Sequence, residues 1–181
     1  MAEQKVILAY GDSLTYGHDA DSQRRHAYED RWPSVLEAGL GGKARVIAEG
    51  LGGRTTAFDD WSAAADRNGV TTLPTLLSSH TPLDLVVLFL GTNDLKPFVN
   101  GSALGAAHGI RRLIEIIKTH PYAFNAPAPK VIVVSPPHVT PTTHAELGPM
   151  FDGAIEVSHS FASHYSRAAK DSGAYFFDSA T

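Results

Sequence analysis

The chain has 181 residues, of which 43% are hydrophobic and 19% are charged, and this composition indicates one globular domain and excludes a disordered chain. Lys and Arg total 15 against 19 Asp and Glu, and the resulting formal charge of −4 disfavours nucleic acid as a partner. The chain has no cysteine, which excludes a disulfide scaffold, a thiolate nucleophile and a cysteine-ligated zinc site.

Apolar segments typical of buried strands recur along the chain. The predicted strands are Lys5–Tyr10, Lys43–Glu49, Leu83–Leu90, Lys130–Ser135 and the shorter Ala174–Phe177. The third and fourth are nearly continuous apolar runs, which is typical of parallel strands that are covered on both faces. No apolar run approaches the ~18 residues of a membrane span, and no signal-peptide pattern is present, so we expect a cytoplasmic protein without a membrane partner.

Helical patterns fall between the predicted strands. The predicted helices are Pro33–Leu40, a weaker Leu73–Leu77 interrupted by Pro74, Ser102–His120 and Met150–Lys170. In the last of these, apolar residues at the spacing of one helix face predict packing against a sheet. The alternation of strands and helices predicts a single α/β domain over residues 1–181 with a parallel sheet.

Glycine and small polar residues follow each of the first three predicted strands. The three segments read GDSLTYG from Gly11, GLGGRTT from Gly50 and GTND from Gly91. In open α/β sheets, ligands bind beyond the carboxyl ends of the strands, where the strand order reverses. These turns therefore predict a functional site at one edge of the sheet.

Ser13 is the candidate nucleophile of this site. A serine at a strand-to-helix turn is exposed above the sheet edge and lies near the positive end of a helix dipole. The alternative is that Ser13 or Asp12 is an ordinary helix N-cap.

Gly53 and Asn93 are candidate donors to a developing oxyanion. Gly53 can offer its backbone N–H, and Asn93 can offer a neutral side-chain amide. The alternatives are a turn that needs a positive φ at Gly53, and a helix cap or Asx-turn at Asn93. Asp94 is expected to brace its loop. Together with the N–H and hydroxyl of Ser13, these donors are typical of acyl transfer through a tetrahedral intermediate.

The blocks GDSLTYG, EGLGGRTT, LGTND and PAPKVIVVSPP resemble those of the SGNH (GDSL) hydrolases, in the expected order and over nearly the whole chain. The resemblance is closest to the small bacterial arylesterase and acyltransferase branch. It implies a flavodoxin-like three-layer α/β/α fold with a five-stranded parallel sheet in the order 2-1-3-4-5. It also implies Ser13 as the nucleophile and oxyanion donors at Ser13, Gly53 and Asn93.

The same resemblance implies a reaction and its partners. The expected activity is hydrolysis of short-chain acyl or aryl esters through an acyl-serine intermediate, with acyl transfer to alcohols as a further activity. The partner is a small-molecule ester, and no metal or organic cofactor is implied. Residues matching Leu14 and Tyr16 lie near the acyl pocket in this branch, and self-association into a homo-oligomer is expected.

One part of the family pattern has no counterpart in the sequence. The family carries an Asp-x-x-His motif after its last strand, and here only Ser179–Thr181 follows Asp178. Asp178 lies close to the place of the acid but lacks the family's spacing. His138 and His144, after the fourth predicted strand, are the remaining substitutes for the base. The family also adds a final amphipathic helix over one sheet face. We therefore expect the sequence to be C-terminally incomplete, with that helix missing.

Two other interpretations stay open at this point. The first is a catalytically impaired family member or fragment that acts as a flavodoxin-like binding module, although GDSLTYG matches neither a phosphate loop nor a dinucleotide fingerprint. The second is a metal-dependent hydrolase, although His144 and Glu146 do not have a known ligand spacing.

Overall fold

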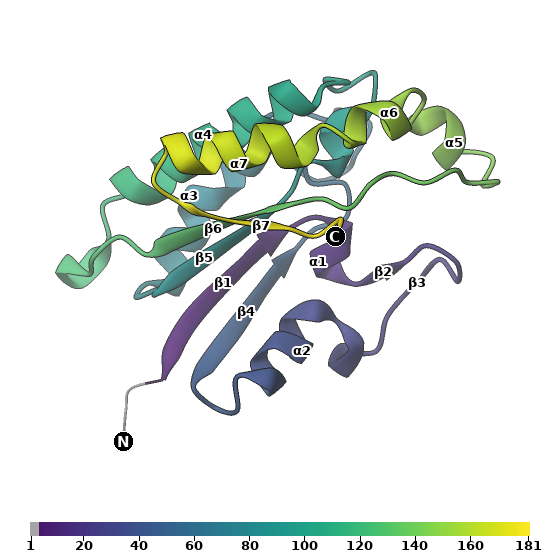
Figure 1. Ribbon diagram of the computed structural model, residues 1–181. Coiled ribbons are helices and arrows are strands. Elements are labelled where there is room, and N and C mark those ends of the chain that lie inside the picture. The colour runs from purple at the N-terminus through teal and green to yellow at the C-terminus, as the bar shows by residue number, and fades with distance from the viewer. Residues whose placement is uncertain (1–3) are drawn as a thin grey trace.

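A parallel sheet forms the centre of the computed structural model, which describes residues 4–181 (Figure 1). Its strands are β1 (Lys5–Gly11), β4 (Ala44–Gly50), β5 (Leu85–Phe89), β6 (Lys130–Ser135) and β7 (Tyr175–Asp178). They lie in the order β4-β1-β5-β6-β7, and every neighbouring pair is parallel. Numbered along the chain, this is the expected order 2-1-3-4-5, so β1 lies between β4 and β5.

Helices cover both faces of the sheet and give the expected three layers (Figure 1). On one face lie α3 (Gly69–His80), α4 (Ala103–Thr119) and α7 (Phe161–Asp171), and on the other lies α2 (Trp32–Gly39). The shorter elements are α1 (Ser13–Tyr16), α5 (Leu147–Met150), α6 (Ala154–Ser158), the 3-10 turns η1 (Tyr28–Asp30), η2 (Thr92–Leu95) and η3 (Ala123–Asn125), and a hairpin of β2 (His18–Asp19) and β3 (Arg24–Arg25).

Alternate residues of the central strands face two separate cores. In β5, Val86 and Leu88 join the larger core under α3, α4 and α7, whereas Val87 joins the smaller core on the α2 side. Both sets are apolar because both faces of the strand are covered. This explains the continuous apolar run in the sequence. Phe161 and Tyr165 of α7 are buried in the larger core.

The α2 side of the sheet is exposed at its β7 edge. Ile132 and Val134 of β6 belong to the smaller core, and their register partners on β7 are Tyr175 and Phe177. Paired positions of neighbouring strands face the same side. Tyr175 and Phe177 are 59% and 56% exposed within residues 4–181. A missing helix was expected to cover such a face, and that expectation stays a prediction.

The prediction of one helix over Met150–Lys170 is wrong, because α5 ends at Met150 and the rest of the segment forms two helices, α6 and α7. Gly153 has a φ of +73° and starts α6 in a left-handed conformation that an α-helix cannot contain. Between α6 and α7, the hydroxyls of Ser158 and Ser160 donate to backbone carbonyls three residues earlier. Such local side-chain bonds compete with helix continuation.

The predicted interruption at Pro74 is also wrong, because α3 runs continuously from Gly69 to His80. Asn68 caps its start by accepting the N–H of Val70. A proline inside a helix removes one backbone hydrogen bond. Leu73 and Leu77 on the same helix are fully buried, and their packing offsets that loss.

Helix α1 packs directly on the carboxyl end of β4. An ideal Cβ at Gly50 would lie 2.2 Å from the backbone N of Tyr16 and 2.5 Å from the carbonyl carbon of Thr15. Real Cβ atoms do not approach backbone this closely, so glycine is required for the contact. This contact fixes the height of α1, and therefore of Ser13, above the sheet.

We predict that Gly50→Ala lowers the free energy of unfolding by about 1–3 kcal/mol, because the backbone of α1 must move away from β4. Gly39→Ala is the matched control, since no atom lies within 4 Å of its ideal Cβ. That variant should gain about 0.5–1 kcal/mol from helix propensity. Urea denaturation measures both values, and equal effects of the two substitutions would contradict the close contact at Gly50.

Candidate active site

Three loops meet at the carboxyl edge of β4, β1 and β5. Gly11 at the end of β1 is in register with Gly50 of β4 and Phe89 of β5, so the loops that follow start side by side. The amide nitrogen of Asn93 lies 3.1 Å from the carbonyl oxygen of Arg54 and 3.4 Å from Oδ2 of Asp12. Asn93 thus contacts Asp12 and Arg54, which are the chain neighbours of Ser13 and Gly53. The three predicted residues therefore lie at the same edge of the sheet.

Ser13 occupies the first position of α1, directly after β1. Asp12 is the N-cap, and its carboxylate accepts the N–H of Leu14 at 3.0 Å. The cap interpretation is therefore confirmed for Asp12 and wrong for Ser13. Ser13 is half-buried, and neither its N–H nor its hydroxyl has a partner within residues 4–181. Both groups are thus free to bind a ligand.

Gly53 has a φ of +83°, so the turn does require a left-handed residue at this position. The turn is closed by the N–H of Arg54, which donates to the carbonyl of Leu51 at 3.0 Å. The N–H of Gly53 itself donates to no group in the described part of the chain. The turn conformation and a free donor are therefore properties of the same residue.

Asn93 does not cap a helix. It lies inside η2, whose N-cap is Gly91 and has no side-chain hydrogen bond. Its side chain is buried, and one amide hydrogen is held by the carbonyl of Arg54. The contact of the amide with Asp12 is long at 3.4 Å, so the second hydrogen is weakly committed.

Asp94 braces the loop, as predicted from the sequence. It is fully buried and accepts both the N–H of Thr56, at 3.0 Å, and the Thr56 hydroxyl. Burial raises the pKa of Asp94 to about 7, although the hydrogen bonds from Thr56 act in the opposite direction. Burial likewise raises the pKa of Asp12 to about 7, against the bond from Leu14. Both carboxyls thus hold a proton up to near neutral pH.

Sequence reasoning missed Arg54, which ties two of the loops together. Its guanidinium is buried and donates through Nη1 to the carbonyls of Gly11, at 2.9 Å, and Glu49, at 2.5 Å. It also lies 4.3 Å from the ring centroid of Tyr10. An arginine inside a glycine-rich turn was the available signal, but its bonding partners depend on the strand order.

Leu14 and Tyr16 both lie on α1, next to the candidate nucleophile. Leu14 is half-buried and Tyr16 is 37% exposed. The guanidinium of Arg25 lies 3.8 Å from the ring centroid of Tyr16 and covers one face of that ring. Substrate contact at Leu14 and Tyr16 stays a prediction.

The histidines considered as substitutes for the base have other contacts. His138 stacks on His159 with ring centroids 4.3 Å apart, and Nδ1 of His144 accepts the N–H groups of Glu146 and Leu147. Asp178 accepts the hydroxyl of Ser135 at 2.8 Å. Across residues 4–181, no imidazole is hydrogen-bonded to Ser13. The candidate nucleophile therefore has no base in contact within residues 4–181.

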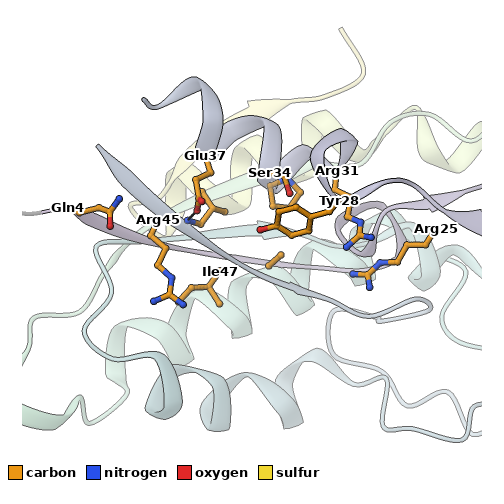
Figure 2. A pocket seen from close by; sticks show the side chains of 11 residues that line it. Gln4, Arg25, Tyr28, Arg31, Ser34, Glu37, Arg45 and Ile47 are labelled. Atoms are coloured by element: carbon orange, nitrogen blue, oxygen red, sulfur yellow. Dashed lines mark hydrogen bonds between the residues drawn. The ribbon is translucent and has the colours of Figure 1, made fainter. Parts of the chain in front are cut away.

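A cavity of about 520 Å³ lies apart from these residues, along the outer edge of β4 and the segment that leads into α2 (Figure 2). Figure 2 shows Tyr28 and Glu37 on one side of it and Arg45 on the other. Glu37 accepts the N–H of Val46 and so occupies part of the free edge of β4. None of the predicted site residues lines this cavity.

No group of three or more His, Cys, Asp or Glu side chains in residues 4–181 is arranged to hold a metal ion. None of the helices found there has the length and apolarity needed to cross a bilayer.

The fold and the candidate site define a class of protein: a serine hydrolase with an α/β/α fold, a candidate nucleophile at the first strand-to-helix turn and candidate anion donors on the two neighbouring loops. The sequence profile of the GDSL-like lipase/acylhydrolase family matches residues 9–181, and the chain belongs to this family.

Solved structures of similar proteins share both fold and sequence. A carbohydrate acetylesterase family member from Sinorhizobium meliloti is 48% identical and superimposes with a TM-score of 0.95, over 98% of this chain and 84% of that one. The aryl esterase of M. smegmatis is 39% identical with a TM-score of 0.90, over 97% and 84%. An arylesterase of Vibrio mimicus is 37% identical over 91 residues, which are 49% of this chain and 37% of that protein. The match thus spans just over a third of that curated relative.

The raised pKa of Asp94 predicts a pH-dependent stability. Between the ordinary pKa of 3.8 and about 7, the folded state holds a proton that the unfolded state has released. The protonated carboxyl of Asp94 therefore makes its greatest contribution to the free energy of unfolding below pH 4, and this contribution is lost as the pH rises to about 7. Asp94→Asn is neutral at every pH and should remove it.

We expect the difference in unfolding free energy between Asp94→Asn and the parent to move in favour of the variant as the pH rises through this window. Urea denaturation at several pH values measures it. Asp152→Asn, at an exposed carboxylate, is the control. A difference at Asp94 that does not vary with pH would show that the carboxyl is ionised throughout.

Proposed function

We propose that the protein is a serine carboxylic ester hydrolase that acts on short-chain acyl or aryl esters. The observation that carries the proposal is that the loops of Ser13, Gly53 and Asn93 leave one edge of the sheet, while the N–H groups of Ser13 and Gly53 have no hydrogen-bond partner within residues 4–181. The amide of Asn93 contacts Asp12 and Arg54, the chain neighbours of the other two residues. A nucleophile next to preorganised neutral donors is the arrangement that acyl transfer needs, because negative charge develops on the carbonyl oxygen of the ester.

In the first half of the proposed reaction, Oγ of Ser13 attacks the carbonyl carbon of the ester. The hydroxyl proton passes to a general base, which the family resemblance assigns to a histidine. The tetrahedral oxyanion accepts hydrogen bonds from the N–H groups of Ser13 and Gly53 and from the Asn93 amide. The carbon–oxygen bond to the alcohol then breaks, the alcohol takes up the proton, and an acyl ester of Ser13 remains.

In the second half, water attacks the acyl-serine, and Ser13 is released with a carboxylic acid. An alcohol in place of water would give a new ester, so acyl transfer is part of the proposal. The buried carboxyls of Asp12 and Asp94 lie next to the donors. Because burial raises the pKa of each to about 7, they place less negative charge beside the oxyanion than exposed carboxylates would.

The similar proteins named above suggest the substrates to test first. They are an arylesterase, an aryl esterase and a carbohydrate acetylesterase family member. Acetate esters of phenols and of sugars are therefore the proposed substrate classes. We also propose that the protein acts in the cytoplasm, without nucleic acid or a membrane as partner. The formal charge of −4 supports the exclusion of nucleic acid.

Self-association is a further part of the proposal. Trp61 is 90% exposed and Phe98 is 60% exposed. These two aromatic side chains flank an ion pair of Lys96 with Asp60, which joins their loops at 3.2 Å. Exposed aromatic rings around a rigid ion pair favour contact between copies of the chain.

The second candidate is a flavodoxin-like binding module or a catalytically impaired relative. One observation favours it: Ser13 has no hydrogen bond to an imidazole within residues 4–181. Such a module would bind a small anion at the same donors without turning it over. Ester turnover that depends on Ser13 separates the two candidates.

We predict that Ser13→Ala abolishes release of p-nitrophenol from its acetate ester, because the attacking oxygen is lost. Ser163→Ala, at an exposed serine on α7, is the matched control and should keep the parental rate. A Ser13→Ala protein that hydrolyses the ester at the parental rate would refute the proposal.

We predict that Asn93→Ala lowers kcat by about 10²–10³-fold with little change in KM, because the oxyanion exists only near the transition state. Steady-state kinetics on the same ester measure both constants, and the melting temperature reports whether the variant is folded. A rise in KM with an unchanged kcat would instead place Asn93 in ground-state binding.

A further inference from the structure

The guanidinium of Arg67 lacks an acceptor, although it is partly buried. Its Nε is buried and has no hydrogen-bond partner, and no ion pair joins it to a carboxylate in the described part of the chain. The other buried or half-buried arginines of residues 4–181 are Arg31, Arg54 and Arg111, and each donates to a carbonyl or carboxylate. A guanidinium carries five N–H donors, and leaving them without acceptors costs free energy.

The backbone holds Arg67 next to the candidate oxyanion site. Its carbonyl accepts the N–H of Thr55 at 2.9 Å and the Thr55 hydroxyl at 3.2 Å. An ideal Cβ on Gly53 would lie 3.5 Å from Nη1 and 3.6 Å from Nε of Arg67. The guanidinium therefore lies against the α-carbon of the residue whose free N–H is a proposed oxyanion donor.

Arg67 also lines a cavity of about 240 Å³, together with Trp61 and the carboxylates of Asp59, Asp60 and Asp66. Those carboxylates already have donors. Asp59 accepts the side-chain amide of Asn68, Asp66 accepts the Asn68 N–H, and Asp60 pairs with Lys96. Among the charged side chains that line this cavity, Arg67 is therefore the one without a hydrogen-bond or ion-pair partner within residues 4–181.

A second guanidinium lies near that of Arg67. Arg54 lies close by, and its own donors are used by backbone carbonyls. Burial is the main cause of the lowered pKa of Arg54, and the positive charge of Arg67 lowers it further. Two neighbouring guanidinium groups repel each other, and a bound anion would relieve this repulsion.

We propose that Arg67 is a specificity-determining residue that binds a carboxylate carried by the ester substrate, next to the scissile carbonyl. This inference rests on the proposed ester hydrolysis at Ser13. The planar guanidinium matches the two oxygens of a carboxylate, which a neutral ester or a sugar hydroxyl does not offer. The protein thus selects acidic esters over neutral esters of the same shape.

The test compares the acidic ester para-acetoxybenzoate with its neutral methyl ester, and each variant is compared with the parent on the same ester so that the different leaving groups cancel. Arg67→Gln should lower kcat/KM for the acidic ester by about 10–100-fold, mainly through KM, because one charge-assisted contact to the bound substrate is lost. The neutral ester should change by less than about 3-fold. Arg67→Lys, which keeps the charge but not the planar fork, should fall between the parent and Arg67→Gln.

Arg45→Gln is the matched control, because it removes the same charge from the exposed edge of β4 and should leave the ratio of the two esters unchanged. The melting temperature of each variant reports folding. If Arg67→Gln leaves the ratio of kcat/KM for the acidic ester to that for the neutral ester unchanged, the inference is overturned. An equal dependence of a neutral sugar acetate on Arg67 would overturn it as well, because the acceptor would then be uncharged.

A binding measurement separates this inference from the proposed function. Titration calorimetry on the Ser13→Ala protein compares para-hydroxybenzoate with the neutral para-hydroxybenzamide. We expect the acid to bind, and adding Arg67→Gln should weaken its binding at least about 10-fold. If the acid binds in this way but the parent protein hydrolyses no ester, the anion site is supported and the proposed hydrolase is refuted. If the parent protein hydrolyses esters through Ser13 but Arg67→Gln changes neither binding nor the ester preference, the hydrolase is supported and the anion site is refuted.

Discussion

The position of β1 between β4 and β5 is the constraint on which the candidate site depends. Because the three strands are parallel and in register at Gly11, Gly50 and Phe89, their loops leave the sheet at one edge. The loop with the proposed nucleophile is the middle one, and the two loops with the proposed anion donors flank it. The absence of a side chain at Gly50 lets α1 rest directly on the sheet, so the height of Ser13 is set by backbone contact.

Polar contacts then hold the three loops in one arrangement. Arg54 donates to Gly11 with its side chain and accepts the amide of Asn93 with its carbonyl, so it joins all three loops. Asp94 fixes the third loop to Thr56 on the second. These contacts are buried, where each hydrogen bond is stronger and each unpaired group more costly than in water. The free N–H of Gly53 and the free groups of Ser13 therefore stand in a rigid frame, as anion stabilisation requires.

The strands and the edge that carries the site could be predicted from the sequence, because buried parallel strands leave long apolar runs and their loops leave glycine and small polar residues. The single helix predicted over Met150–Lys170 was wrong, because the apolar spacing does not report the left-handed backbone at Gly153. Arg54 and Arg67 were missed for another reason. Both guanidinium groups lie against backbone atoms of loops that only the folded sheet brings near, and no local pattern records that proximity.

The central claim is that Ser13 is the nucleophile of an ester hydrolase whose donors lie on the neighbouring loops. Peptide mass spectrometry after reaction with a fluorophosphonate tests it most directly, because this reagent bonds to an activated serine oxygen next to an oxyanion site. The account predicts a single adduct, located on Ser13. Continued ester hydrolysis with Ser13 unmodified, or an adduct on a different residue, would contradict it.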